Sequence, residues 1–202
     1  MHTNIDLRAH HRIAVLTSVD VVSSVTPDDL SRSTPCAGWN LADLLAHMTA
    51  QHRGFTAAAR GQGADLAVWQ PVTVAAAVAS DPAATYAAAA AAVLEAFAHD
   101  GVLDANFALP DFGPGATFPG SMAIGFHFID YVVHTWDVAR TVGRPVDLPD
   151  DVIAAALPLA FAVPDGDFRT GFFDQAIQAT ESGADFDRIL THLGRSPEWT
   201  PR

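Results

Sequence analysis

Four titratable side chains recur at helical spacing within one apolar segment of the chain. His127, Asp130, His134 and Asp137 lie in residues 119–140, PGSMAIGFHFIDYVVHTWDVAR, at intervals of three, four and three positions. On a helix these intervals place the four side chains on one face. The other faces are almost entirely apolar, which predicts a helix buried in a core. The polar stripe must then be buried or line a cavity, where charged groups need partners.

A metal ion is the simplest partner for such a stripe. Asp130 and His134 are four residues apart, so their Cβ atoms lie about 5–6 Å apart on a helix and both side chains can reach one ion. The third ligand must come from another helix, and His47, in residues 41–52 (LADLLAHMTAQH), is the best candidate. His52 is expected to be more exposed. Two histidines and one carboxylate leave coordination positions open, which favours a reactive ion that could activate a water or hold a thiol as thiolate.

The remaining polar residues near these positions have less specific interpretations. His127 is a candidate pocket residue, whereas Asp137 could orient a metal ligand or pair with Arg140 or a loop backbone, and we favour a structural role for it. Cys36 has no recognisable base beside it in residues 35–39, PCAGW. Buried free cysteines are usually inert, so a structural role is favoured for Cys36 as well.

The composition excludes several function classes. The chain has 202 residues, half of them hydrophobic, which is enough for a single domain over residues 1–202. A net charge of −12 argues against nucleic acid and anionic membrane surfaces as partners. The absence of lysine excludes a Schiff-base lysine and a Walker-type phosphate lysine. A single cysteine, a polar N-terminus and the lack of an uninterrupted apolar span predict a cytoplasmic protein.

The elements that must position these residues are predicted to be helices. Apolar periodicity and cap residues predict helices over about 5–25, 41–60, 83–100, 119–141, 149–161 and 185–193, with a short helix over 73–79. Asn40 and Asp43 form a weak capping-box pattern before the second of these helices. Residues 102–118 are rich in Gly and Pro and predict a small hairpin or an ordered loop. We therefore expect an all-α four-helix bundle with extra short helices and this insertion before the last bundle helix.

Three segments of the chain resemble one known family. Residues 34–47, TPCAGWNLADLLAH, resemble the TPC-x-GW…DLL-x-H signature of the mycothiol-dependent maleylpyruvate isomerase N-terminal domain family. Residues 134–145 and 186–197 resemble its HGWDLAR…GRP and DRLL…LGRDP signatures. The family belongs to the DinB-like superfamily of metalloenzymes. The resemblance implies a four-helix bundle with a three-residue site for zinc or nickel.

The resemblance assigns the metal ligands to His47, Asp130 and His134, the same three residues that spacing suggests. Asp130 stands where the family's isomerase has glutamate, which is one methylene longer. Characterised relatives use the metal with a low-molecular-weight thiol, such as mycothiol or bacillithiol, for isomerisation or S-transfer. The implied function is therefore a metal-dependent enzyme that acts on a small-molecule thiol or thiol adduct, with mycothiol as cosubstrate. A homodimer is compatible with the resemblance.

Two other functions are consistent with the sequence. The chain could be a non-catalytic protein that binds a metal or small molecule in the bundle cavity, since no general base is recognisable outside the ligand set. The polar stripe could instead be an internal hydrogen-bond network that binds no metal. Tight ligand binding without turnover would select the binding protein. A metal-free protein whose melting temperature does not change on adding Zn²⁺ or Ni²⁺ would select the hydrogen-bond network.

Overall fold

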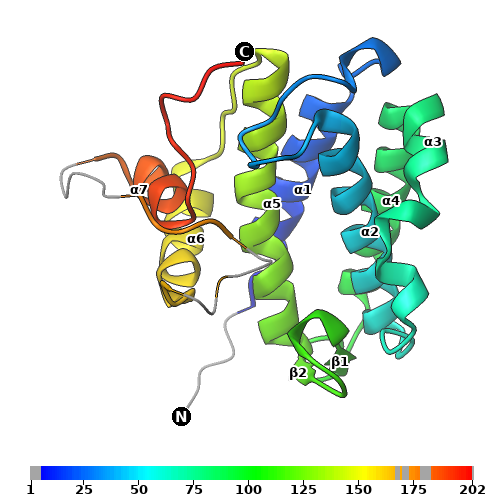
Figure 1. The fold of residues 1–202 in the computed structure, drawn as a ribbon. Helices are drawn as coiled ribbons and strands as arrows, with labels where there is room; N and C mark the ends of the chain where they lie inside the picture. The colour runs from blue at the N-terminus through cyan, green and yellow to red at the C-terminus, as the bar shows by residue number, and fades with distance from the viewer. Residues whose placement is uncertain (1–5, 167–168, 170–172, 178–182, 202) are drawn as a thin grey trace.

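Four long helices form the body of the molecule, and Figure 1 shows how they are arranged. The computed structural model describes residues 6–166, 169, 173–177 and 183–201. The bundle helices are α1 (Arg8–Val22), α2 (Leu41–Ala59), α4 (Pro82–Ala98) and α5 (Gly120–Val142). Helix α1 packs against α4 and α5, and α2 packs against the same two helices, so the four close into a ring. The predicted four-helix bundle is confirmed.

Shorter elements surround this bundle. They are α3 (Ala75–Ser80), β1 (Asn106–Ala108), β2 (Thr117–Pro119), α6 (Asp150–Ala162) and α7 (Asp185–His192). Strands β1 and β2 pair antiparallel immediately before α5, so the insertion predicted over 102–118 is a hairpin. Helices α6 and α7 pack together beside the bundle, and α6 contacts α1 and α5. The predicted helix over 5–25 is α1; residue 5 lies outside the described residues.

Four short 3-10 helices complete the described elements in the connecting segments. They span Pro27–Asp29, Leu66–Trp69, Pro71–Thr73 and Pro110–Phe112. The last of these lies in the hairpin between β1 and β2. Within the described part of the chain, no helix is both long and apolar enough to cross a membrane.

Local capping sets the position of the helices that carry the candidate ligands. The Asn40 side chain accepts a hydrogen bond from the Asp43 amide at 2.9 Å, and the Asp43 carboxylate accepts one from the Asn40 amide at 3.2 Å. This confirms the capping box and starts α2 two turns before His47. Gly143 closes α5 with a φ of 72°, a left-handed conformation that glycine adopts without strain.

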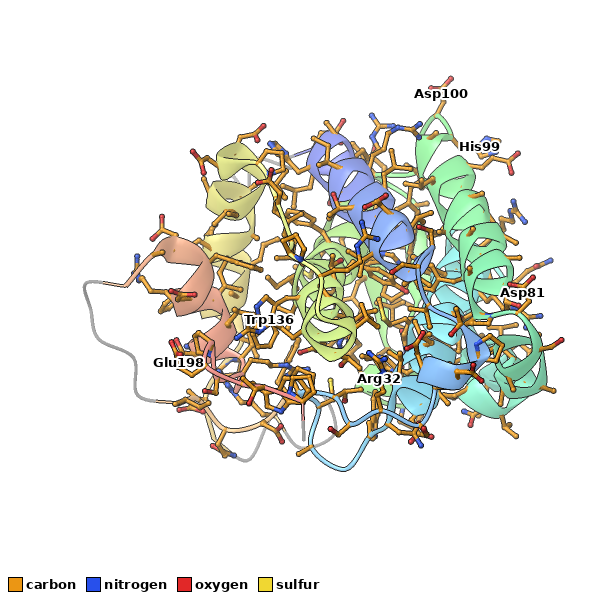
Figure 2. The ribbon with its side chains drawn as sticks, turned by 90° about the horizontal axis from the view of Figure 1, so that it is seen from above. Arg32, Asp81, His99, Asp100, Trp136 and Glu198 are labelled. Carbon is orange, nitrogen blue, oxygen red and sulfur yellow. The ribbon has the colours of Figure 1, made fainter. Side chains whose placement is uncertain are left out.

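Helix α5 is the most deeply enclosed helix of the bundle. Eighteen of its 23 residues are buried, as the apolar pattern predicted. Trp136 belongs to the hydrophobic cluster that joins α5 to α6 and α7, and Figure 2, seen from above, shows it on that side of the helix. In the first half of α5 the more exposed positions are Met122, Phe126 and Asp130, spaced four residues apart. This half of α5 therefore presents one narrow accessible stripe.

Candidate metal centre

His47 on α2 lies against Asp130 and His134 on α5. Each residue offers one ligand atom, and these atoms all lie within 4.8 Å of one another. His134 Nε2 is 3.2 Å from Asp130 Oδ1, and the His47 and His134 rings meet edge to face with centroids 5.4 Å apart. The structure thus brings together the three residues selected from the sequence. That they bind a metal stays a prediction.

The charges around His134 favour a cation at this position. Burial by itself lowers the pKa of His134, but the charge of Asp130 and hydrogen bonds to Asp130 and Asp137 outweigh burial and raise the pKa well above its usual value. Burial likewise raises the pKa of Asp130, but the neighbouring His134 lowers it below the usual value. A site that attracts a proton this strongly also suits a divalent metal ion, which can replace the proton.

His47 is held in the neutral form that a metal ligand needs. Burial lowers the pKa of His47 to about 4, so its imidazole is uncharged at neutral pH. The Trp39 ring, which is 38% exposed, lies over His47 with a centroid distance of 5.0 Å. The Asp130 side chain is 23% exposed, whereas that of His134 is 5% exposed. We call His47, Asp130 and His134 the donor set, because each offers one possible metal-ligand atom. The donor set is accessible from the side of His47 and Asp130 and closed behind His134.

Asp137 supports His134 from that closed side. Its Oδ2 accepts a hydrogen bond from His134 Nδ1 at 2.8 Å, because a carboxylate can only accept. Asp137 also accepts from Cys36 Sγ at 3.1 Å and from Arg195 Nη2 at 3.2 Å. Of the alternatives considered for Asp137, orientation of a ligand residue fits these contacts. Pairing with Arg140 is wrong, because that guanidinium binds the Pro197 carbonyl instead.

Arg195 stabilises the ionised form of the Asp137 carboxylate. Burial by itself raises the pKa of Asp137, but the charge of Arg195 and hydrogen bonds from His134 and Arg195 bring it to about 2. Burial, reinforced by the charge of Asp137, raises the pKa of the Cys36 thiol. Cys36, His134 and Asp137 also lie close enough to hold an ion. The Arg195 guanidinium is within 3.3 Å of Cys36 Sγ, however, and its positive charge disfavours a cation there.

Arg195 is a buried residue of this site that no local sequence pattern identifies. It follows α7 and is 58 positions from Asp137, so no local spacing connects the two. The only signal was its place in the third family-like segment, 186–197. Cys36, for which no adjacent base was recognised, does lie beside His134 and Asp137, but its raised pKa keeps it a protonated donor, consistent with the structural role favoured for it.

Two other histidines lie apart from the candidate metal centre. His127 is 1% exposed and hydrogen-bonds through its two nitrogens to His11 at 2.8 Å and to His52 at 3.2 Å. It therefore belongs to a buried chain of histidines in the bundle interior, separate from the three candidate ligands. The expectation that His52 is exposed is wrong: it is fully buried and stacks on Tyr131 with a centroid distance of 4.1 Å.

Comparisons with known proteins agree with this architecture. A family model described as the mycothiol maleylpyruvate isomerase N-terminal domain matches residues 12–139, more than half of the chain. Two uncharacterized proteins, from two strains of Mycobacterium tuberculosis, are each 29% identical over 164 residues, covering 81% of this chain and 81% of their own.

Solved structures extend the comparison to the fold. The crystal structure of the mycothiol-dependent maleylpyruvate isomerase superposes with a TM-score of 0.59 at 16% identity, covering 82% of this chain and 73% of that chain. A histidine-to-alanine mutant of that enzyme gives a TM-score of 0.60 at 13% identity with the same coverage. At these identities the similarity shows a shared fold.

Proposed function

The chain belongs to the mycothiol maleylpyruvate isomerase N-terminal domain family, and from this membership we propose that it is a divalent-metal-dependent enzyme using a low-molecular-weight thiol. Zinc or nickel is the proposed ion, and mycothiol is the proposed cosubstrate in an isomerase or S-transferase reaction. The observation that carries the proposal is the convergence of His47, Asp130 and His134 with one accessible side. The proposed unit is the single domain over residues 1–202.

The proposed roles follow from the contacts of each residue. His47, Asp130 and His134 would hold the ion, and Asp137 would keep His134 in the tautomer whose Nε2 lone pair faces it. A bound zinc or nickel ion would lower the pKa of a coordinating thiol, so that the thiolate forms at neutral pH. Arg195 neutralises Asp137, which limits the negative charge behind His134. Substrates would approach from the side of His47 and Asp130.

The metal assignment is tested by elemental analysis of protein purified without chelator or metal-affinity resin. We expect about one zinc or nickel per chain, lost in His47→Ala and His134→Ala. His99→Ala is a matched control, because His99 is exposed at the end of α4 and outside the donor set. Unchanged metal stoichiometry in His47→Ala would show that the ligand assignment is wrong. No metal in native or metal-soaked protein would favour the internal hydrogen-bond network.

Thiol binding is tested in the cobalt-substituted protein. A thiol that coordinates the ion adds a sulfur-to-metal charge-transfer band to the visible spectrum, whereas binding elsewhere does not. We expect N-acetylcysteine, a low-molecular-weight thiol, to produce this band in the protein with its native sequence. The band should be absent in His47→Ala. A spectrum that does not respond to thiol would contradict the proposed cosubstrate class.

A non-catalytic binding protein is the alternative, and one observation favours it. Next to the three candidate ligands, the Asp137 carboxylate is hydrogen-bonded to Arg195, and the Cys36 thiol has a raised pKa. Neither residue therefore offers a free base at neutral pH. Such a protein would bind metal and thiol without turning over electrophiles. Thiol-dependent isomerisation or S-transfer in the metal-loaded protein would exclude this alternative.

A further inference from the structure

The accessible stripe of α5 continues beyond the candidate ligands. Phe126 lies one turn before Asp130, and Met122, which is 50% exposed, lies one turn before Phe126. On α2, Gln51 lies one turn after His47 and is also partly exposed. Residues four apart on a helix are surface neighbours, so both helices extend the accessible side of the donor set in the same direction. That direction leads to the β1–β2 hairpin (Figure 1).

The hairpin completes this surface with aromatic rings. Phe112 stacks on Phe126 with centroids 5.0 Å apart, and Phe118 lies edge-on to Phe112 at 4.9 Å and to Phe126 at 5.3 Å. We call these three residues the aromatic cluster. Gln51 Nε2 donates a hydrogen bond to Asp111 Oδ2 at 3.4 Å, which ties the hairpin to α2. The aromatic cluster therefore lies one helical turn from Asp130, beside the helix that carries His47.

The charge of this surface restricts what it can bind. Among the residues that the structure describes, the polar members of this surface beyond the three candidate ligands are Gln51 and Asp111, and no arginine belongs to it. A carboxylate on a group bound at this surface would thus lie near Asp111. Phe112 is 46% exposed, although large aromatic side chains are usually covered. The surface suits an uncharged apolar group.

We propose that the aromatic cluster of Phe112, Phe118 and Phe126 binds a neutral aromatic or aliphatic group carried by the thiol or thiol adduct. The inference rests on the proposed function, because the sulfur of the thiol or thiol adduct would bind at His47, Asp130 and His134 while its apolar group contacts the aromatic cluster. It adds a substrate class: thiols and adducts with a neutral apolar substituent are preferred to those with a carboxylate substituent. Phe112 is the specificity-determining residue that is easiest to vary, since it lies on the exposed hairpin.

The test is calorimetric titration of metal-loaded protein with three thiols: benzyl mercaptan, 4-(mercaptomethyl)benzoate and 2-mercaptoethanol. Benzyl mercaptan is expected to bind about 10-fold more tightly than either of the other two. Phe112→Ala should weaken benzyl mercaptan binding by about 3- to 10-fold and leave 2-mercaptoethanol unchanged, as expected for loss of an aromatic contact. Phe112→Tyr should preserve the preference. Phe161→Ala is the matched control, because Phe161 is 48% exposed but lies on α6.

Failure of the subsite and failure of the proposed function give different results. If Phe112→Ala leaves the preference for benzyl mercaptan intact, or if the native protein has no such preference, the subsite is wrong while thiol binding stands. If no thiol binds to protein that holds its metal, the proposed function is wrong. Benzyl alcohol, which has no thiol, then tests the subsite alone: it should shift the NMR signals of the Phe112, Phe118 and Phe126 rings, and unshifted rings would overturn the proposal.

Discussion

His134 contacts a different carboxylate through each ring nitrogen. Nε2 faces Asp130 at 3.2 Å, and Nδ1 donates to Asp137 at 2.8 Å. The second contact fixes the tautomer, and Arg195 keeps the buried Asp137 ionised. Substituting Asp137 would therefore change the tautomer and orientation of His134 without altering the accessible side formed by His47 and Asp130.

Asp137→Asn is expected to weaken metal binding by about 10- to 100-fold, because an amide no longer supplies the negative charge that orients His134 and increases its basicity. The measurement is competition for zinc against a chelator of known affinity. Asp104→Asn, a substitution in the turn before β1, is the control. Because the change also leaves Arg195 buried without its partner, circular dichroism must first show that the variant is folded. A folded variant with native affinity would contradict the role given to Asp137.

Cys36 is expected to react slowly with thiol reagents in the folded protein. Burial and the charge of Asp137 raise its pKa, and only 8% of the residue is exposed. Because the thiolate is the reactive form, labelling with iodoacetamide at pH 7 should be at least about 100-fold slower than in denaturant. It is the only cysteine, so mass spectrometry reports on it directly. Rapid labelling of native protein would mean that Cys36 is activated.

At the scale of the helices, a chain of histidines connects three members of the bundle. His11 on α1 contacts His127 on α5, which contacts His52 on α2. All three are buried, and Tyr131 stacks on both His52 and His127. Neutral imidazoles can satisfy these hydrogen bonds because each has one donor and one acceptor nitrogen. The helices are thus joined by groups that must stay uncharged.

Stability should fall as the pH drops below about 6.5. Burial lowers the pKa of His11 to about 3, and it lowers those of His52 and His127 well below the usual value of 6.5. Between pH 6.5 and 3 the unfolded state binds a proton at His11 that the folded state does not, and the lowered pKa values of His52 and His127 act in the same direction. Each histidine then removes up to about 1.4 kcal/mol of unfolding free energy per pH unit. His134, whose pKa is raised, acts in the opposite sense and loses its contribution at higher pH.

His11→Phe isolates the contribution of one histidine. The ring keeps a similar size beside Phe97, its neighbour at 4.9 Å, but does not titrate. The free energy of unfolding of the variant should depend less steeply on pH, because up to one proton fewer is taken up on unfolding. This holds even if the variant is less stable at pH 7. Urea unfolding at pH 7 and pH 5 gives the difference. An unchanged pH dependence would show that His11 is not held neutral in the folded state.

At the scale of the whole molecule, the candidate metal centre draws on distant segments. Helices α2 and α5 supply the three candidate ligands, the loop before α2 supplies Cys36, and the segment after α7 supplies Arg195. A bound ion would join α2 and α5 in the folded state only, with Cys36 and Arg195 behind His134. The unfolded chain has no preformed site, so binding of a metal there would be coupled to folding.

Zinc is therefore expected to raise the melting temperature. At free zinc of about 1,000 times the dissociation constant, mass action adds about 4 kcal/mol to the free energy of unfolding. For a chain of this size that corresponds to roughly 8–16 °C. Differential scanning calorimetry measures the shift, and His47→Ala should show none. A native protein that melts at the same temperature with and without zinc would contradict the metal site.

Local sequence patterns determined the helices and the main candidate ligands. The apolar periodicity of residues 119–140, the Asn40–Asp43 capping box and the Gly- and Pro-rich insertion predicted α5, the start of α2 and the hairpin. The four-residue interval of Asp130 and His134 put them side by side. These features depend on residues within about two helical turns, where backbone geometry alone decides which side chains are neighbours.

Only the tertiary structure decided which partners each polar residue meets. His127 and Asp137 are ten residues apart, about 15 Å along α5, so they face different levels of the bundle although they share a face. His52 is five residues from His47 and thus about 140° around α2, which turns it to the interior. Arg195 reaches Asp137 because α7 packs beside the bundle. Contacts between distant segments depend on how helices pack, and the pattern within each segment does not encode that.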